Sequence, residues 1–473
     1  MSAPDAQLGG TGLTEKTVSR VAELTLICGV ALAVLAFGGT EPASFALVEI
    51  LLMGAAALLI ARAGRDAVHF SAKTLLVPAV LAAVVLLQLC PLPLGAWERL
   101  APGENSTPGV GLARLTIEPY STRAHFLILL TCIIAFYLAQ IAARDRQHKR
   151  RLIRFVTILG AFEAFYGLVQ YLTGWQKIFA YVKKYDLEEA TGTYINRNHY
   201  AGFLGMVLPF SLALVFYEYE SLRRNPLHPA ASLKKLMIRP NLEKLIFWQA
   251  VAVVIFAGII FSRSRMGIVA ASASLFVIFG LSAFSRFHGK MGHLLSASFL
   301  VVSICLALWI GPGAIVARFA SVSDEYTLKD QSRLSIWRDD VRLIRQHLWL
   351  GTGFGTFPIA FTAVQTTFLG KFVNHAHNDY LEVASDLGLP AALVLFASVV
   401  FALARAIVTS LSAQERFERL VALGCAGSIV AVLLHSLVDF NLYIPANALF
   451  FSMILGLAMA TPPRQSMARS EAR

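Results

Sequence analysis

Long apolar runs recur along the sequence from near its first residue to near its last. Each is roughly 15–21 residues long, and a helix of about 20 apolar residues spans the hydrocarbon core of a bilayer. An ordinary soluble domain would not contain so many of them. The runs cover Val21–Phe37, Phe45–Ile60, Thr74–Leu92, His125–Ala143, Leu152–Leu172, His199–Tyr217, Leu245–Phe261, Gly267–Phe284, Leu294–Ile310, Leu389–Ile407, Leu420–Leu437 and Ala446–Ala460. We therefore predict an all-α polytopic membrane protein with about twelve transmembrane helices.

The charge balance agrees with this fold class. Hydrophobic residues make up 56% of the 473 residues and charged residues only 15%, with a formal net charge of +12. In a soluble protein that excess would suggest nucleic acid, but no aromatic-and-basic stripe accompanies it, so we expect no nucleic-acid partner. The five cysteines lie in or beside apolar runs without CxxC spacing, which indicates neither a disulfide framework nor a zinc site. The first apolar run is expected to be a retained helix rather than a cleaved signal peptide.

The distribution of lysine and arginine predicts the orientation. Basic residues gather in alternate connections, and positively charged loops are retained in the cytoplasm. This places both termini in the cytoplasm and leaves three long connections outside: Pro93–Thr122, Thr173–Asn198 and Gly311–Gly388. The last is the longest, and we expect it to fold as a helical periplasmic insert. The chain would then divide into spans one to nine (1–310), a catalytic insert (311–388), and spans ten to twelve with a cytoplasmic tail (389–473).

An amphipathic helix is expected inside this insert. Apolar residues recur at three- and four-residue spacing over Leu334–Leu348, while arginines occupy the other faces. An interfacial helix would place such arginines near lipid headgroups, which is our interpretation of Arg342 and Arg345. Arg333 and Arg338 are the better candidates for a functional site.

The segment Asn374–Glu382, NHAHNDYLE, carries the clearest chemical signal. Asn378 is expected to cap a helix that runs through Glu382, which leaves His377 at the boundary between water and membrane. A neutral histidine there can accept a proton as a general base. Alternatively, His375 and His377 are hydrogen-bonded polar residues at a helix entry, or an H-x-H pair that binds a metal. The nearby carboxylates offer no third ligand at a typical spacing, so metal binding is the minor alternative.

Three arginines lie where the orientation rule disfavours them. Arg263 and Arg265 occupy a very short outward turn, and Arg197 precedes the sixth span. A cation in a short outward loop opposes the positive-inside rule, so a compensating role is expected. Guanidinium groups are suited to holding a phosphate bidentately. The alternative is contact with lipid headgroups. This interpretation suits Arg263 better than Arg265.

Three weaker features have competing interpretations. The run Gly351–Gly355 has the composition of a phosphate-binding turn, but such runs more often end a helix, and we expect that here. His435 and Asp439 are four residues apart and share a helix face, which predicts a structural hydrogen bond. Glu49 and Glu163 lie inside apolar runs, where a buried carboxylate marks either a polar contact between helices or the proton path of a transporter.

Together these segments resemble the O-antigen ligase and Wzy-type polymerase superfamily of bacterial envelope glycosyltransferases. The resemblance covers most of the chain: about twelve spans and one large periplasmic insert between the ninth and tenth, a GT-C-like architecture. The matching motifs are Ser264-Arg265 with Gly267, Arg333–Trp337, Gly351–Gly355, and His377-Asn378 with Leu381-Glu382. Two further stretches, Asn196–His199 and His435–Leu442, look like the polymerase branch.

The resemblance implies an inverting transfer, independent of metal and cofactor, from an undecaprenyl-diphosphate-linked glycan at the periplasmic face of the bacterial inner membrane. His377 would deprotonate the acceptor hydroxyl, and its choice over His375 rests on its position beside Asn378. Neutralising the growing charge of the diphosphate can replace proton donation to this leaving group. The diphosphate would be held by Arg265 and Arg197 with Arg333 or Arg338 assisting, and the site would be supported by His375, Asn378, Glu382 and Arg263.

Two functions are open within this superfamily. A polymerase joins one lipid-linked repeat unit to another and extends an O-antigen or exopolysaccharide, whereas a ligase moves the glycan to lipid A–core; we favour the polymerase. A polysaccharide-lipid transporter or flippase is the alternative of another class. It predicts inverted repeats and charge near the bilayer midplane, whereas this chain concentrates charge and histidine at its outer boundary. A protein that regulates chain length is a further candidate partner of either enzyme.

Overall fold

The computed structural model describes residues 13–63, 70–100, 112–224, 240–284, 322–367, 370 and 372–460. Among these residues, nine helices are long and apolar enough to cross a membrane. They are α1 (Glu15–Leu35), α2 (Pro42–Arg62), α5 (Pro119–Ala143), α6 (Arg146–Thr173), α7 (Arg197–Arg224), α9 (Pro240–Phe261), α10 (Arg265–Phe284), α16 (Leu389–Ser412) and α17 (Arg416–His435). The prediction of an all-α polytopic membrane protein is therefore confirmed.

Two shorter apolar helices, α3 (Ala72–Leu89) and α18 (Pro445–Met459), correspond to two more of the predicted spans. The remaining predicted span, Leu294–Ile310, lies outside the described residues. The connections hold two small hairpins, β1 (Leu92–Pro93) with β2 (Leu112–Ala113) and β3 (Lys177–Ile178) with β4 (Tyr181–Val182). The short helices outside the insert are α4 (Leu94–Leu100), η1 (Phe37–Gly39) and η4 (Asn441–Tyr443).

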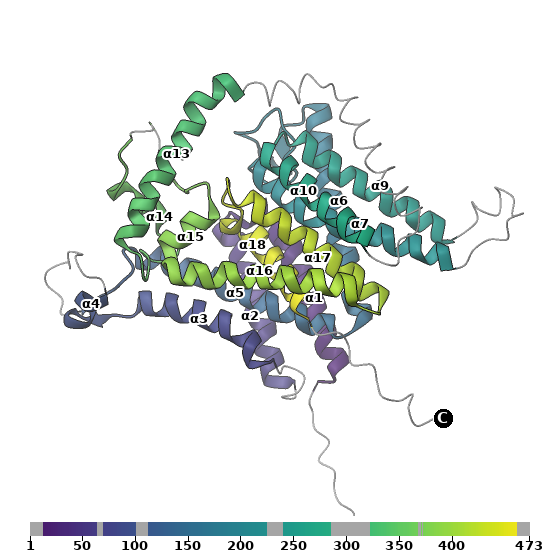
Figure 1. Cartoon of the computed structure of the whole chain (residues 1–473), viewed down its shortest axis with the longest axis horizontal. Helices are drawn as coiled ribbons and strands as arrows, with labels where there is room; N and C mark the ends of the chain where they lie inside the picture. Colours follow the sequence, from purple (N-terminus) through teal and green to yellow (C-terminus); the bar gives the residue numbers. More distant parts are fainter. Residues whose placement is uncertain are drawn as a thin grey trace, which may run out of the picture.

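Helix α7 is the centre of the bundle. Its apolar window is 94% buried and that of α17 is 83% buried, against 22% for α2 and 28% for α16. It packs on α6, α9, α10 and α17, and Figure 1 shows these helices together on one side of the molecule. Helices buried on all sides suit an interior position, whereas α2 and α16 expose apolar side chains in the manner of lipid-facing helices.

One end of the bundle is tied by buried ion pairs. Lys149 of α6 donates to Glu418 of α17 at 2.6 Å, and Arg419 of α17 donates to Glu220 of α7 at 3.1 Å. Buried charges are tolerated when they are paired in this way. These contacts fix the start of α17 against α6 and α7, and α17 carries His435 at its other end.

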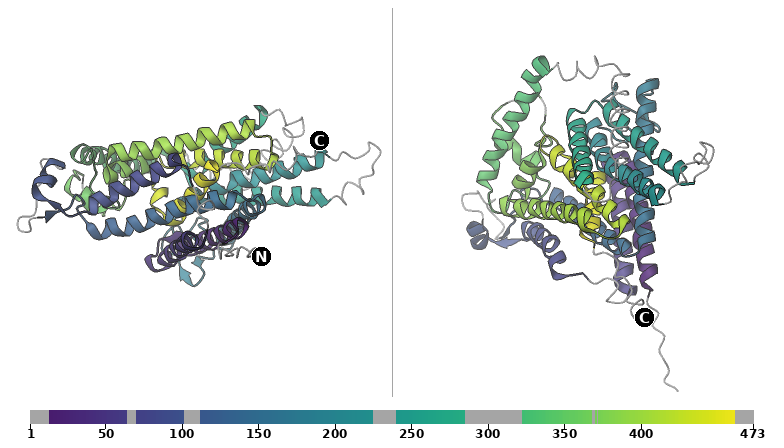
Figure 2. Two further views of the ribbon diagram at one scale, coloured as in Figure 1. Left: turned by 90° about the horizontal axis from the view of Figure 1, so that it is seen from below. Right: turned by 45° about the vertical axis from the view of Figure 1, so that its right-hand side comes forward.

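The described part of the insert is helical and has a small core of its own. Helix α13 (Val322–Gln346) is followed by α14 (Phe357–Ala360), η3 (Phe361–Ala363) and α15 (Asp379–Leu387). These elements lie at one side of the bundle (green in Figures 1 and 2). Their core consists of Ile336, Leu343, Phe357, Ala360, Phe361, Val364, Val373 and Ala376, with Trp337 against it. The expected amphipathic helix is present, but Leu334, which we placed on its apolar face, is 57% exposed.

A buried carboxylate holds the glycine-rich turn in place. Asp386 of α15 accepts hydrogen bonds from the N–H groups of Gly355 (2.7 Å) and Phe357 (3.0 Å) and from the Tyr443 hydroxyl (2.8 Å). At Gly355, φ is +78° and an added Cβ would lie 2.0 Å from His125 Nδ1, so only glycine fits. The turn therefore binds a carboxylate of the protein itself, and its interpretation as a structural turn after a helix is correct.

We expect Asp386→Ala to destabilise the protein. The substitution leaves buried donors unpaired, at a cost of about 1–3 kcal/mol each. Thermal unfolding of the purified protein in detergent should show a lower Tm than wild type. Glu188→Ala is the control because its side chain is 85% exposed, and its Tm should be unchanged. Equal Tm values for the two variants would contradict this role of Asp386.

Candidate functional site

Two segments far apart in the sequence are joined at the start of α15. The Asp379 N–H donates to the carbonyl oxygens of Ser436 (3.0 Å) and Asp439 (3.2 Å). The Ser436 hydroxyl donates to the Asp379 carboxylate at 2.6 Å, and Asn378 Nδ2 donates to the Leu437 carbonyl at 3.0 Å. These bonds hold the histidine motif of the insert against the connection between α17 and η4.

The same motif has the helix cap that its sequence predicts. Asn378 Oδ1 accepts from the N–H groups of Tyr380 (3.0 Å) and Leu381 (3.2 Å), so α15 begins at Asp379. His377 lies immediately before the cap, and its φ is +52°. A non-glycine residue in this left-handed region is strained, and such strain gathers at functional sites because the surrounding structure must maintain it.

Three histidines from three elements surround the Asp439 carboxylate. Oδ1 lies 3.8 Å from His199 Nε2 and 3.9 Å from His377 Nδ1, and Oδ2 lies 3.8 Å from His435 Nε2. His199 is in the first turn of α7, His377 precedes α15, and His435 is the last residue of α17. All three facing nitrogens are buried without a hydrogen-bond partner among the described residues. Such unsatisfied buried groups are uncommon in proteins, and a catalytic role is one of their explanations. We call these four residues the histidine–Asp439 cluster.

The cluster is arranged around an ionised carboxylate. Burial alone would raise the pKa of the Asp439 carboxyl, but the facing nitrogens of His199 and His377, together with His435, hold this pKa well below its usual range. For His377 burial is the largest effect and lowers the pKa, Asp439 opposes it, and the neighbouring Arg333 and His375 lower it further. His377 is therefore neutral at physiological pH while Asp439 is charged.

The second histidine of the motif has a different environment. His375 Nδ1 lies 2.7 Å from Glu382 Oε1, and Glu382 Oε2 accepts from the Ala376 N–H at 2.8 Å. Its ring stacks on Phe440, with the centroids 3.9 Å apart and the planes 12° apart. Burial lowers the pKa of His375 to about 4 and raises that of Glu382 well above its usual range, so both residues are held in their neutral forms.

Of the arginines that the sequence singled out, Arg333 acts on the cluster electrostatically. Trp337 Nε1 donates to the Ala376 carbonyl at 2.9 Å, which fixes α13 against the histidine motif. Arg333 lies one helical turn before Trp337 on the same face. Its charge contributes to the lowered pKa of His377, whereas Arg338 is exposed.

Arg197 and Arg263 lie instead against acidic residues of the connection before α7. The Arg197 guanidinium is hydrogen-bonded to Glu189, and its Nε is 3.7 Å from Asp186. Arg263 Nη1 is 3.5 Å from Glu188. These pairs neutralise the two guanidinium groups, so both arginines have local electrostatic partners at the positions that the orientation rule disfavours.

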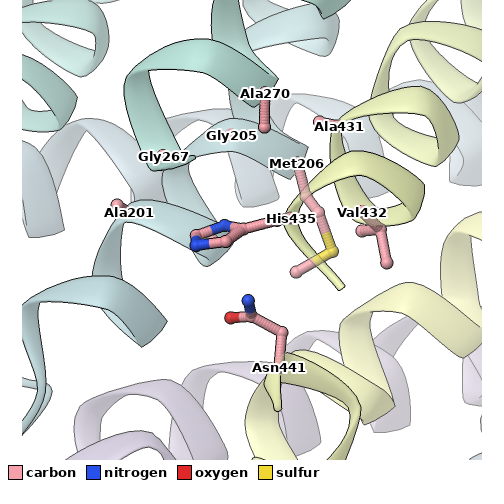
Figure 3. A pocket seen from close by; sticks show the side chains of 10 residues that line it. Ala201, Gly205, Met206, Gly267, Ala270, Ala431, Val432, His435 and Asn441 are labelled. Atoms are coloured by element: carbon pink, nitrogen blue, oxygen red, sulfur yellow. The ribbon is translucent and has the colours of Figure 1, made fainter. Parts of the chain in front are cut away.

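Arg265 begins α10 and is half-buried. Two residues later, Gly267 borders a small cavity of about 10 Å³ that is also lined by His435 and Asn441. Figure 3 shows the His435 imidazole and the Asn441 amide facing this cavity, with Met206 beside them. A volume of this size holds about one water molecule. The first turn of α10 therefore adjoins the histidine–Asp439 cluster.

The structure thus identifies three residues that sequence reasoning did not place in the site: Asp439, His199 and His435. The spacing of His435 and Asp439 was recognised, but it predicted only a structural hydrogen bond. Nothing in the local sequence relates Asp439 to His377, because the two meet only through the packing of α15 on the connection after α17. Among the described residues, no group of three or more His, Cys, Asp or Glu side chains has the geometry to hold a metal ion.

We expect His377→Gly to be more stable than His377→Ala. The left-handed conformation costs a non-glycine residue about 1–2 kcal/mol, and glycine avoids this cost. The greater entropy of the unfolded chain with glycine offsets only part of the stability gained. Thermal unfolding in detergent would compare the two variants. The exposed Phe372 of the same loop is the control position, because its φ is not positive. There, Phe372→Gly should be less stable than Phe372→Ala. Glycine less stable at both positions would contradict the strain at His377.

The comparisons with known proteins agree with the motifs. Residues 250–396 match a family model described as O-Antigen ligase. This segment runs from α9 through the insert into α16, and it contains Arg265, Arg333, His375 and His377, whereas Asp439 lies beyond it. No curated protein matches the chain. The match covers less than half of the chain, and it confirms the resemblance to the O-antigen ligase and polymerase superfamily. The apolar helices of the described residues identify the chain as a multi-pass membrane protein.

Proposed function

We propose that the protein is an inverting, metal-independent glycosyltransferase that polymerises undecaprenyl-diphosphate-linked repeat units at the periplasmic face of the bacterial inner membrane. The observation that carries the proposal is the strained His377, whose Nδ1 is buried against the ionised Asp439 while its side chain is 35% exposed. This is the arrangement of a general base that a second group orients.

The pairing with Asp439 selects the tautomer of His377. A carboxylate accepts but does not donate, so it favours the ring form that carries its proton on Nδ1. Nε2 is then the lone-pair nitrogen that takes the proton of the acceptor hydroxyl. The distance of 3.9 Å is longer than a hydrogen bond, and contacts of this kind often tighten only when substrate is bound.

His375 is less suited to this task. With Glu382 neutral, the carboxyl O–H donates to His375 Nδ1, and the ring proton lies on Nε2, which leaves no basic nitrogen. A pKa of about 4 would also make His375 a weak base. These observations support His377 as the base, with His375, Asn378 and Glu382 shaping the loop around it.

The proposed reaction is a single displacement. As His377 Nε2 removes the proton, the acceptor oxygen forms a bond to the anomeric carbon, and the bond from this carbon to the diphosphate oxygen breaks with inversion. The leaving diphosphate takes the electron pair, and positive charge beside it stabilises the transition state. Arg265 and Arg333 support this role by their positions next to the cluster. Arg197 and Arg338 stay weaker candidates, because Arg197 is paired with carboxylates and Arg338 is exposed.

A ligase that transfers the glycan to lipid A–core is the second candidate, and it is favoured by the description of the matching family, O-Antigen ligase. The structure weakens the sequence argument for a transporter, which rested on buried acids such as Glu163. Both carboxylate oxygens of Glu163 accept from Thr193, one from its N–H and one from its hydroxyl, each at 2.8 Å. This buried acid therefore has a structural partner and does not require a proton path.

The decisive experiment supplies purified protein with a lipid-diphosphate-linked repeat unit as the only substrate, in the presence of chelator. A ladder of longer lipid-linked glycans would support the polymerase. Transfer only after lipid A–core is added would identify a ligase instead. No transfer in either reaction would contradict the glycosyltransferase proposal and favour the transporter.

His377→Gln should lower the rate of transfer by about 10²–10⁴-fold, the usual contribution of a general base. The variant should still insert in the membrane and unfold at a Tm near that of wild type. His347→Gln is a matched control, since this histidine of the same insert lies outside the histidine–Asp439 cluster, and its activity should persist. Full activity of a well-folded His377→Gln protein would rule out His377 as the base.

The pH dependence tests the role of Asp439. Activity requires neutral His377, so the rate should fall as the pH drops through the pKa of this residue, which is lowered by burial. Asp439 raises that pKa, while Arg333 and His375 lower it. Asp439→Asn removes the stabilising negative charge, so the acid limb of the pH–rate profile should move to lower pH as the maximal rate falls. An acid limb that stays in place or moves to higher pH would contradict the proposed pairing.

A further inference from the structure

A deep groove lies on the bundle away from the histidine–Asp439 cluster. It has a volume of about 420 Å³ and is formed by α3, α5, α16 and α18, with mostly apolar side chains along its length. Figure 1 shows α3 and α16 on either side of α5 at the edge of the bundle. A groove between membrane helices that is lined by apolar side chains suits a hydrocarbon chain.

One end of this groove is polar and positively charged. Arg144, the residue after α5, and Arg405 of α16 both line it, as does Ser71, the cap of α3. Arg405 is fixed in place because it donates to the carbonyl oxygens of Ala458 and Ala460, each at 3.1 Å. Arg144 lies 5.6 Å from the centroid of the Phe70 ring. Two guanidinium groups at one mouth of an apolar groove complement an anionic headgroup on a hydrocarbon tail.

An unpaired donor lies just inside this mouth. Gln140 lines the groove, is only 8% exposed, and its Nε2 has no hydrogen-bond partner among the described residues. An unpaired buried amide is costly in hydrocarbon, so a ligand that accepts its hydrogen bond would be stabilised. Gln140 is four residues before Arg144 on α5, and therefore on the same face about 6 Å deeper.

We propose that the groove binds an anionic phospholipid, with its phosphate between Arg144 and Arg405. One acyl chain would fill the apolar part, and an ester carbonyl would accept from Gln140 Nε2. In a phospholipid the ester groups lie deeper than the phosphate, which is the order in which the groove presents its amide and its arginines. The ligand is a resident of the membrane and takes no part in the transfer reaction.

The position of the mouth distinguishes this lipid from a diphosphate-linked donor. His125, near the start of α5, packs against Phe354 and Tyr443 beside the insert. Arg144 follows 19 residues later, about 28 Å along the helix axis. A donor with its diphosphate at the histidine–Asp439 cluster therefore cannot place that group between Arg144 and Arg405. By the positive-inside rule this end of α5 faces the cytoplasmic leaflet, which is rich in anionic lipid.

The test is binding of phosphatidylglycerol to delipidated, detergent-purified protein, measured by native mass spectrometry and by thermal unfolding. We expect wild type to bind one phosphatidylglycerol more tightly than phosphatidylcholine, with a higher Tm. Arg144→Gln should weaken the binding about fivefold, the usual effect of one basic residue near an anionic lipid. Gln140→Leu keeps the size of the side chain but removes the donor, and it should also weaken the binding.

Arg146→Gln is the matched control, because it removes the same charge only two residues after Arg144. The Arg146 side chain is 50% exposed and lies outside the groove. It should bind as wild type does. Ser398→Phe, which fills the middle of the groove, should prevent binding without any change of charge. The proposal is overturned if phosphatidylcholine binds as tightly as phosphatidylglycerol, or if Gln140→Leu and Ser398→Phe both bind phosphatidylglycerol like wild type. Displacement of the phospholipid from the groove by undecaprenyl diphosphate would also overturn it.

Discussion

The buried carboxylate of Asp439 is the group on which the arrangement of the candidate site depends. It carries a negative charge at the end of a helical bundle, where an unpaired ion would be severely destabilising. Three histidines from α7, α17 and the insert face it, so it lies where elements meet that no local sequence relation connects. The neighbouring Asp379 has the opposite behaviour: burial raises its pKa well above the usual range, so Asp439 is the site's charged acid.

The contacts around Asp439 are incomplete in a manner that suits catalysis. Distances of 3.8–3.9 Å leave the facing histidine nitrogens without hydrogen bonds, and His377 is held in a strained backbone conformation by the cap that follows it. The Asp386 carboxylate of the insert, by comparison, accepts hydrogen bonds from three donors. The carboxylate that supports the glycine-rich turn is thus fully hydrogen-bonded, whereas the histidine nitrogens that face Asp439 have no hydrogen-bond partner among the described residues.

Several conclusions followed from the sequence because they depend on local chemistry. The apolar runs predicted the spanning helices, and Asn378 predicted the helix start, since a cap is specified within four residues. The glycine run was correctly interpreted as a turn for the same reason. The arginines were harder to judge, because their predicted positions in outward loops suggested phosphate binding. Arg197 and Arg263 lie instead against acids of the connection before α7, which pattern alone did not reveal.

The sequence by itself therefore determined the membrane class, the helices and the resemblance to a known family, because hydrophobic length, capping and short motifs are all encoded within neighbouring residues. Only the tertiary structure decided which residues form the site. Asp439 and His377 are separated by more than the length of two spans, and they meet because the backbone of α15 bonds to the connection after α17. Likewise, the choice between His375 and His377 depends on which carboxylate each ring faces and how deeply each is buried. Such contacts between distant segments are set by packing, which leaves no periodic signal in a single sequence.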